Sequence, residues 1–392
     1  MNNILDAADK KCIGCGLCVA VCPVDAIKID LDKDGFINPV VDDKKCIGCK
    51  KCKLSCVKFS STDSFLLKEG TVFSCRSKSD AVRDRSSSGG IGFEISSWAY
   101  DNGYDVWGVV YDYSANCAKH KMAVCKDDLL KFQGSKYIQS HTGDLCDYLV
   151  HNPHCKALIF GTPCQIKMIR NILNMNANRN CILVDVFCRG VPSYNLWKKY
   201  LQEIVGTQSV SKISFRDKSK GWHICQMSIE MDSSIYSRPA SNDLFYRLYT
   251  SSFCFRDSCF SCELKLDECY SDLRIGDFWG EKFEHDDKGV SLVIANSNIG
   301  VDVFSSVRKN LSYQKELFAD VVLAQKYIYN TWNGSKISKM RSFLMSDLSL
   351  SQIYNKLCRP KFYVRFAVFL YSALPRKCQL AIKSIFKPLL HG

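Results

Sequence analysis

Two runs of four cysteines with the same spacing stand near the start of this chain of 392 residues. Each run follows C-x2-C-x2-C-x3-C, with Pro23 after the first and Val57 at the matching place after the second. Thiolates at every third residue can bind three corners of a cubane, and in two-cluster ferredoxins the fourth cysteine of each run binds the other cluster. The spacing therefore predicts two [4Fe-4S] clusters. We assign one to Cys12, Cys15, Cys18 and Cys56, and the other to Cys46, Cys49, Cys52 and Cys22.

The two runs belong to a duplicated unit, in which the letters KCIGC begin at Lys11 and again at Lys45. The glycines Gly14, Gly16 and Gly48 suit loops whose backbone turns sharply around sulfur. Zinc is the alternative, because it also binds pairs of C-x2-C cysteines. Zinc sites rarely space three ligands as C-x2-C-x2-C and then add a fourth followed by proline, so the iron-sulfur assignment is favoured.

The cysteine content of the whole chain points to a reducing compartment. There are 23 cysteines, but a chain of this length can bury an ordinary core without a disulfide framework. Their metal-ligand spacing, and the lack of an apolar leader before the first motif, predict a cytoplasmic protein.

The formal net charge of +13 is concentrated towards the C-terminus, where eight Lys or Arg and no acid follow Leu348. The longest apolar stretch, Phe362 to Leu374, is interrupted by Arg365 and is too short to span a bilayer, so we expect no transmembrane helix. The basic, apolar tail either packs on the main body or touches the inner face of a membrane peripherally. Nucleic-acid binding is not favoured, because no recognition motif accompanies the charge.

The middle of the chain has the pattern of a mixed sheet covered by helices, an α+β or α/β fold. Helix-like stretches cover 165–173 and 194–205. Loops at the carboxyl ends of the strands are then the expected places for chemistry. Short apolar runs predict buried strands at 106–110, 157–160, 182–187 and 291–295.

Two polar segments are candidates for binding a nucleotide. The Ser/Gly-rich segment 86–92 precedes a helix-compatible stretch, and a Gly-rich turn at a helix N-terminus presents free N–H groups to a phosphate. A plain surface turn is the alternative. The segment 134–140 crowds a cation, a phenol, an amide and hydroxyls, which suit a nucleotide or flavin. A half-exposed strand would show a similar pattern.

A series of motifs in the middle of the chain resembles a known family. They are SSGG from Ser87, GSKY from Gly134, GTPCQ from Gly161, FCRGVPS from Phe187, FRDK from Phe215, GW from Gly221, CFSC from Cys259 and DLRIGDFWG from Asp272. In this order they resemble the coenzyme F420 hydrogenase/dehydrogenase beta-subunit family over residues of about 75 to 310. With the dicluster module in front, the chain resembles the bacterial members of that family.

The resemblance implies a flavoprotein, usually with FAD, whose flavin exchanges a hydride with one partner and single electrons with iron-sulfur clusters. The expected flavin contacts lie in the two polar segments and are Ser87, Ser88, Gly89, Gly90, Lys136, Tyr137, Gln139 and Ser140. A third [4Fe-4S] cluster is expected on four cysteines of the family motifs, Cys164, Cys188, Cys259 and Cys262. The alternatives are a local set of Cys254, Cys259, Cys262 and Cys269, or ordinary thiols.

If a hydride passes to an organic substrate, a proton donor is needed nearby. The polar candidates on a family motif are His223, Asp217 and Lys218. A hydrogen-bonded structural role is the alternative for the histidine.

The leading hypothesis is an iron-sulfur flavoenzyme that exchanges electrons with a reduced carrier such as a ferredoxin, or with a partner oxidoreductase. The alternative is a non-catalytic electron-relay subunit of a larger complex. We expect four parts: a 2x[4Fe-4S] module over 1–62, a flavin-binding part over 63–150, a part with the third cluster and further flavin contacts over 151–310, and a helical, basic tail over 311–392.

Overall fold

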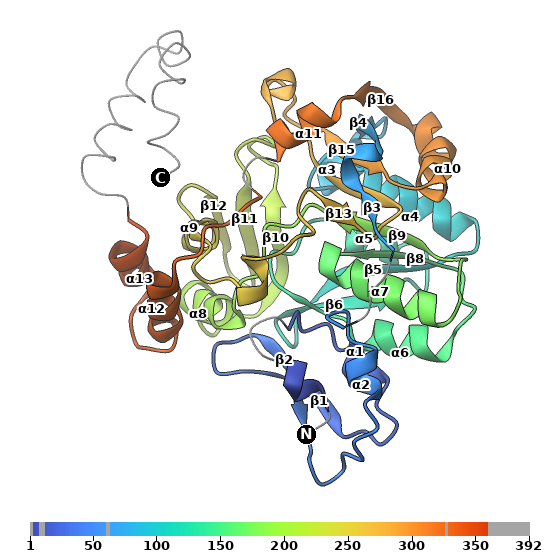
Figure 1. Ribbon diagram of the computed structural model, residues 1–392. Coiled ribbons are helices and arrows are strands. Elements are labelled where there is room, and N and C mark those ends of the chain that lie inside the picture. The colour runs from blue at the N-terminus through green and yellow to red at the C-terminus, as the bar shows by residue number, and fades with distance from the viewer. Residues whose placement is uncertain (1–2, 8–11, 60–62, 326–327, 360–392) are drawn as a thin grey trace.

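A nine-stranded mixed sheet forms the centre of the protein (Figure 1), whose computed structural model describes residues 3–7, 12–59, 63–325 and 328–359. The strand order is β16-β4-β15-β14-β9-β8-β5-β6-β7. Strands β14, β9, β8 and β5 run parallel to one another, as do β6 and β7, and the remaining neighbours are antiparallel. The strands are β4 (Thr71–Ser77), β5 (Asp105–Asp112), β6 (Cys117–Met122), β7 (Ser140–His141), β8 (Ala157–Gly161), β9 (Ile182–Val186), β14 (Leu273–Asp277), β15 (Ser291–Ala295) and β16 (Leu311–Glu316).

The central strands are almost continuously apolar, which is typical of parallel strands covered on both faces. In the register of the sheet, Leu158 stands opposite Ile182, and Val184 opposite Leu273. The four apolar runs predicted as strands are confirmed as β5, β8, β9 and β15, and the expected mixed sheet covered by helices is confirmed.

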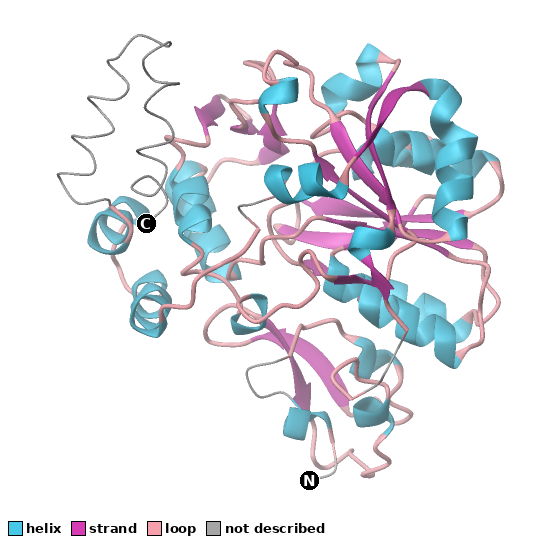
Figure 2. Ribbon diagram, turned by 45° about the horizontal axis from the view of Figure 1, so that its top comes forward, coloured by secondary structure: helices cyan, strands magenta, loops and turns pink. Residues whose placement is uncertain are grey.

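Helices cover both faces of the sheet (Figure 2). On one face α6 (Gly143–His151) and α7 (Pro163–Met175) contribute Leu145 and Ile169 to an apolar core. On the other face α4 (Ile91–Asp101) and α10 (Asn298–Val307) contribute Ile95 and Val303. The predicted helix at 165–173 is confirmed as α7, which begins at Pro163 because Thr162 and Gln165 form a capping box there.

A second, smaller body lies beside the sheet (Figure 1). Its three strands form an antiparallel meander, and its core is aromatic: the Trp197 and Phe245 rings lie 5.3 Å apart, edge to face. The helix predicted at 194–205 is confirmed here as α8. The elements are α8 (Tyr194–Ile204), β10 (Val210–Asp217), β11 (Gln226–Met231), β12 (Ile235–Pro239), α9 (Leu244–Ser251), α12 (Gly334–Leu344) and α13 (Leu350–Leu357).

The N-terminal module is seen at one end of the molecule (Figure 1). It contains η1 (Ile4–Ala7), α1 (Leu17–Ala20), the hairpin of β1 (Ile27–Leu31) and β2 (Ile37–Val41), and α2 (Lys51–Leu54). The duplication predicted from the sequence is visible, because each cysteine run leads into one four-residue helix. Helix α1 packs on α6, and Leu17 enters the core that contains Leu145.

The part of the chain expected as a helical tail from residue 311 begins differently. Its first residues form strand β16, which pairs with β4 at the edge of the large sheet, and α11 (Phe318–Ala324) follows. The sheet also takes strands from both sides of the expected boundary at 150 and 151. The apolar stretch from Phe362 to Leu374 lies outside the described residues, so its contacts stay a prediction. No helix among the described residues is long and apolar enough to cross a membrane.

The remaining short elements connect these bodies. They are β3 (Phe65–Leu66), η2 (Leu67–Glu69), α3 (Asp80–Arg85), α5 (Asp128–Phe132), η3 (Asp257–Cys259), β13 (Glu268–Cys269), η4 (Glu281–Phe283) and η5 (Arg308–Asn310).

Candidate cluster and cofactor site

The loops of the two N-terminal cysteine runs have the sharp turns that the sequence predicted. Gly14 has φ +66°, and a Cβ there would clash with the carbonyl oxygen of Ile37, so only glycine fits. The Gly14 N–H donates to Cys12 Sγ at 3.3 Å. At the end of the same run the Ala26 N–H donates to Cys22 Sγ at 3.3 Å. Backbone N–H groups thus already point at sulfur, as hydrogen bonds that tune a cluster do.

The fourth cysteine of each run lies with the opposite run, as the assignment requires. Burial raises the pKa of Cys15, and with the added effect of the nearby Cys12 and Cys56 it reaches about 12. Burial likewise raises the pKa of Cys52, with added contributions from Cys49 and Cys22. Cys56 is therefore a neighbour of the first run and Cys22 a neighbour of the second. We call Cys12, Cys15, Cys18 and Cys56 the first set, and Cys46, Cys49, Cys52 and Cys22 the second set.

No three His, Cys, Asp or Glu side chains of the described residues lie close enough together to bind one metal ion. A cubane differs from a single ion in that its four thiolates stand at separate corners of the cluster. The four cysteines of the first set lie within electrostatic reach of one another, and Cys52 lies within reach of Cys49 and Cys22 in the second set. Thiolate donors of this kind fit such a cluster.

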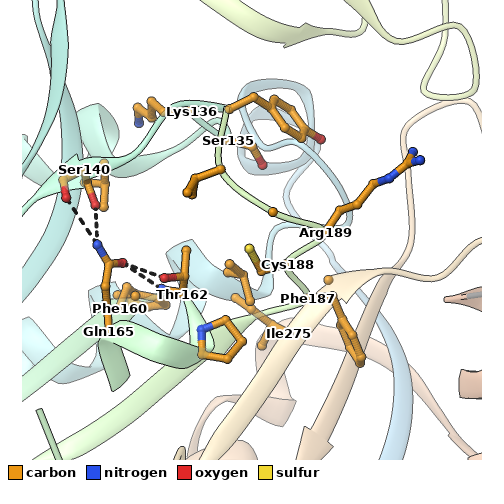
Figure 3. A pocket seen from close by; sticks show the side chains of 18 of the residues that line it. Ser135, Lys136, Ser140, Phe160, Thr162, Gln165, Phe187, Cys188, Arg189 and Ile275 are labelled. Atoms are coloured by element: carbon orange, nitrogen blue, oxygen red, sulfur yellow. Dashed lines mark hydrogen bonds between the residues drawn. The ribbon is translucent and has the colours of Figure 1, made fainter. Parts of the chain in front are cut away.

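One large cavity, of about 1240 Å³, opens where the sheet, the small body and the N-terminal module meet. Both polar segments predicted to bind a nucleotide line it, the first from Ser86 to Gly92 except for Gly89, and the second from Gly134 to Ser140. The predicted flavin contact at Gly89 is therefore not on the cavity wall, because Gly89 packs against Cys75 of β4. Figure 3 shows Ser135, Lys136 and Ser140 above Thr162 and Gln165, with Cys188 near the centre of the view. The cavity exceeds the usual range of about 300–1,000 Å³ for small-ligand pockets, so it has room for a dinucleotide.

The Ser/Gly segment forms the N-terminus of α4 and faces this cavity. The N–H groups of Ile91 and Gly92 donate to no other described residue, as expected for the first turn of a helix. A Cβ on Gly89 would lie 2.5 Å from the Cys75 carbonyl oxygen, so the loop must pass close to β4. The Ser135 N–H donates to Ser87 Oγ at 2.7 Å, which ties the two segments together. This arrangement fits a phosphate group at the helix N-terminus.

The side chains of the second segment are mostly used by the protein itself. The Lys136 ammonium donates to the carbonyl oxygens of Lys131, Phe132 and Gln133 at the end of α5, and burial lowers its pKa to about 7. The Tyr137 hydroxyl accepts from Arg216, 3.1 Å away.

Two further side chains of this segment also have protein partners. Gln139 donates to the Ile13 carbonyl oxygen at 2.9 Å, and Ser140 Oγ accepts from Gln165 at 3.0 Å (Figure 3). The segment lines the cavity as predicted, but these four side chains mainly brace its walls.

Sequence reasoning missed two polar groups at this cavity. Arg216 is buried and pairs with Asp277 at 2.8 Å, yet its Nε has no partner among the described residues. Gln133 Oε1 is likewise buried and without a partner there. Both residues line the cavity. A free donor and a free acceptor in one cavity fit a ligand with polar atoms of both kinds. The FRDK motif, which contains Arg216, was the available sequence signal.

The four cysteines predicted to hold a third cluster all line the same cavity. Cys164 lies in the first turn of α7, directly after β8, and Cys188 lies in the loop after β9. These parallel strands end at one edge of the sheet, which brings both cysteines together. Burial raises the pKa of Cys188, and Cys259, Cys164 and Cys262 raise it further, so all four thiols are neighbours. We call Cys164, Cys188, Cys259 and Cys262 the third set.

The alternative local set does not gather around the cavity. Cys254 is buried in the aromatic core of the small body, where its thiol donates to the Leu248 carbonyl oxygen. Cys269 is buried in β13, where it pairs with Phe65 of β3. Neither of these two cysteines lines the cavity that contains Cys259 and Cys262.

Comparison with known proteins matches two separate parts of the chain. Residues 155–319 match the C terminus of the coenzyme F420 hydrogenase/dehydrogenase beta subunit, and residues 11–59 match the 4Fe-4S dicluster domain. Over this stretch the chain is similar to that beta subunit. The family predicted from the sequence motifs is thus confirmed, and the chain is an iron-sulfur protein related to the beta subunits of oxidoreductases.

Individual relatives of this beta-subunit-type protein are distant. An uncharacterized protein of Methanocaldococcus jannaschii is 24% identical over 323 residues, which is 70% of this chain and 86% of that protein. A chain of the F420-reducing nickel-iron hydrogenase complex from Methanosarcina barkeri aligns with a TM-score of 0.46 and 16% identity, covering 69% of this chain and 90% of that chain.

The three catalytic candidates of the beta-subunit region lie outside the cavity. Asp217 accepts from the Ser219 N–H at 2.9 Å in a turn, and exposed His223 contacts the Phe283 carbonyl oxygen at 3.1 Å. The Lys218 ammonium donates to the Lys288 carbonyl oxygen at 2.6 Å, and burial lowers its pKa to about 8. The contacts of all three side chains are local, and a catalytic role for any of them stays a prediction.

Proposed function

We propose that this chain is an iron-sulfur flavoprotein oxidoreductase that couples two-electron chemistry at a flavin to one-electron transfer through three [4Fe-4S] clusters. One observation carries the proposal: the Ser/Gly loop of α4 and the whole third set of cysteines line a single cavity. A bound flavin supplies hydride exchange with one partner and single-electron exchange with clusters. FAD is the flavin we expect, because the cavity has room for a dinucleotide.

In this proposal the three sets of cysteines form a series. Cys18 of the first set packs in one small apolar cluster with Cys52 and Cys22 of the second. Cys15 of the first set and Cys164 of the third both pack against the core that contains Leu145 and Ile169. The first set would therefore lie between the other two. The chain would hold clusters along a path from the outer part of the N-terminal module to the cavity.

The cavity residues have distinct tasks in this proposal. The N–H groups of Ile91 and Gly92, at the positive end of the α4 dipole, would hold a phosphate group. Arg216 Nε would donate to the cofactor and Gln133 Oε1 would accept from it, since both are buried without other partners. Apolar walls that include Phe160, Phe187 and Ile275 would exclude water from the reacting region (Figure 3).

The experiment that tests the proposal is anaerobic purification of the chain, followed by reconstitution with iron, sulfide and FAD. We expect bound FAD, released on denaturation, and about twelve iron and twelve acid-labile sulfide atoms per chain. A Cys188→Ser variant should lose about four iron atoms, whereas the matched Cys254→Ser variant should keep all of them. Absence of bound flavin contradicts the flavoprotein proposal, and about eight iron atoms in the unaltered chain contradict the third cluster.

A non-catalytic electron-relay subunit is the other candidate function. Such a subunit would pass electrons to a partner oxidoreductase through protein contacts and would need no flavin. The cavity, with its free polar groups beside the third set, favours the flavoenzyme. The electron partner in that case is a reduced carrier or a partner oxidoreductase, and the measurement of bound flavin separates the two functions.

A further inference from the structure

The duplicated N-terminal module is strongly asymmetric in its surroundings. The first cysteine loop, from Cys12 to Val24, has no charged side chain. The main body holds it through hydrogen bonds to backbone oxygens: Gln139 donates to Ile13, Thr142 Oγ1 to Cys15 at 2.6 Å, and Arg256 to Cys12 at 2.8 Å. This copy of the repeat therefore forms the contact between the N-terminal module and the main body, which we call the joint.

The second cysteine loop has the opposite character. From Lys44 to Lys58 there are six lysines and no acid, although the exposed Asp42 and Asp43 directly precede this stretch. Ile47 is 64% exposed and Leu54 is 72% exposed, so two large apolar side chains stand in the water among these cations. We call the surface of Lys44, Lys45, Ile47, Lys50, Lys51 and Leu54 the lysine face; all six side chains are exposed.

The two cysteine loops therefore have the same backbone conformation but different surfaces. The first loop forms without lysines, so the backbone conformation does not require the lysines of the second. Gly14 and Gly48 have almost the same φ, +66° and +67°, and the helices that follow are equally short. Yet a Cβ on Gly14 would clash with its surroundings, whereas a Cβ on Gly48 would meet nothing within 4 Å. The second loop has open space around it, and Cys49 of the second set is exposed there.

We propose that the lysine face is the docking site of a small acidic one-electron carrier protein, which exchanges electrons with the cluster of the second set. This inference rests on the proposed function, because it gives the series of clusters its outer partner. The partner should be acidic, because its negative charges would complement the four lysines of the face. Opposite charges on two proteins raise the association rate by 10- to 1,000-fold and do so mainly at low salt. Ile47 and Leu54 supply the apolar centre that such a contact needs when the charges form its rim.

The test uses the reconstituted full chain and one variant that reverses four charges, Lys44→Glu, Lys45→Glu, Lys50→Glu and Lys51→Glu. A milder variant replaces the same lysines by Gln, which removes the charges without adding new ones. The matched control reverses four exposed lysines elsewhere, Lys220→Glu, Lys309→Glu, Lys315→Glu and Lys339→Glu. The probe is an oxidised acidic ferredoxin, whose binding is measured by calorimetry at low and high salt.

A second readout separates docking from the state of the clusters. Stopped-flow absorbance follows reduction of the clusters by two electron donors. One is the same ferredoxin, reduced beforehand, and the other is reduced methyl viologen, a small cation that needs no docking site on the protein. Vesicles of anionic lipid form a third arm, because the same cations would attract a membrane surface.

We expect the Glu variant to bind ferredoxin at least about tenfold more weakly at low salt, with the Gln variant between it and the unaltered chain. High salt should remove most of this difference, and reduction by methyl viologen should not slow down. Normal ferredoxin binding by the Glu variant, or equal weakening by the control variant, would overturn the docking site. So would slower reduction by both donors alike, or binding of vesicles without binding of ferredoxin. Loss of flavin with intact ferredoxin binding would instead contradict only the flavin part of the proposed function.

Discussion

Arg274 and Asp185 form an ion pair that is fully buried between β14 and β9, with both side chains 0% exposed. The pair is bidentate, at 2.7 and 2.6 Å, and a third guanidinium nitrogen donates to the carbonyl oxygens of Leu264 and Lys265. Those carbonyls follow Cys262 in the chain. A single arginine therefore fixes the loop of one cysteine of the third set to the centre of the sheet.

Removing Arg274 should cost much more stability than an average substitution. In an Arg274→Met variant, Asp185 is left buried without its partner, and breaking a buried pair in this way costs about 3–5 kcal/mol. The measurement is urea unfolding of the reconstituted chain. The double variant Arg274→Met with Asp185→Leu should recover part of the loss, because no charge then stays buried. A loss below about 1 kcal/mol for Arg274→Met would show that water reaches this pair.

At the residue scale, the sequence allowed roles to be predicted for cysteines more readily than for arginines. The cysteines have characteristic spacing, so all three sets could be named, and the four cysteines of the third set line one cavity. The assignment of ligands to clusters stays a prediction. Arg216, Arg256 and Arg274 have no such spacing, because an arginine receives its role from partners far away in the chain. Arg256, for example, binds backbone oxygen more than two hundred residues before it.

The α4 helix and its Ser/Gly loop position the cavity, and the loop depends on a glycine. A Cβ at Gly89 would lie 2.5 Å from the Cys75 carbonyl oxygen and 2.7 Å from the Ser291 N. We expect Gly89→Ala to displace the loop and to reduce bound FAD severalfold, while the iron content stays unchanged. Released flavin and total iron of the reconstituted chain measure both effects. The control is Gly143→Ala at the start of α6, where a Cβ meets nothing within 4 Å. Full FAD content in the Gly89→Ala variant would contradict a binding site for the FAD phosphate at the N-terminus of α4.

The positions of strands could be predicted where the sequence is continuously apolar. The contacts of polar side chains could not be predicted where those side chains bind neighbouring elements. The apolar runs of β8 and β9 are buried on both faces, so their sequences leave no alternative. The segment 134–140 lines the cavity as expected, but Lys136 caps α5 and Gln139 holds the N-terminal module. Such contacts depend on which elements pack nearby, and a local pattern does not contain that information.

At the scale of the whole molecule, the N-terminal module is joined to the main body largely through backbone oxygens of its first cysteine loop. The module's hairpin adds a second contact, since Ser193 and Asn195 at the start of α8 bind the carbonyl oxygens of Asp34 and Lys33. The joint therefore lies next to the first set of cysteines and leaves the second set at the surface. In the proposed function, electrons that enter at the lysine face would cross this joint to reach the cavity.

Arg256 is the side chain on which this joint depends most. It is buried and donates to Cys12 O at 2.8 Å, to Asn38 Oδ1 at 3.1 Å and to the Ile37 carbonyl oxygen. Hydrogen bonds from a charged group contribute about 1.5–3 kcal/mol each, so Arg256→Met should lower the free energy of local opening by roughly 2 kcal/mol or more. Amide hydrogen exchange in residues 12–41 should then be at least about thirtyfold faster, with little change in the central strands. An Arg238→Met variant, on an exposed strand of the small body, should leave this exchange unaltered. If Arg256→Met also leaves it unaltered, the hairpin contacts alone hold the module, and the first set does not depend on the arginine for its place beside Cys164.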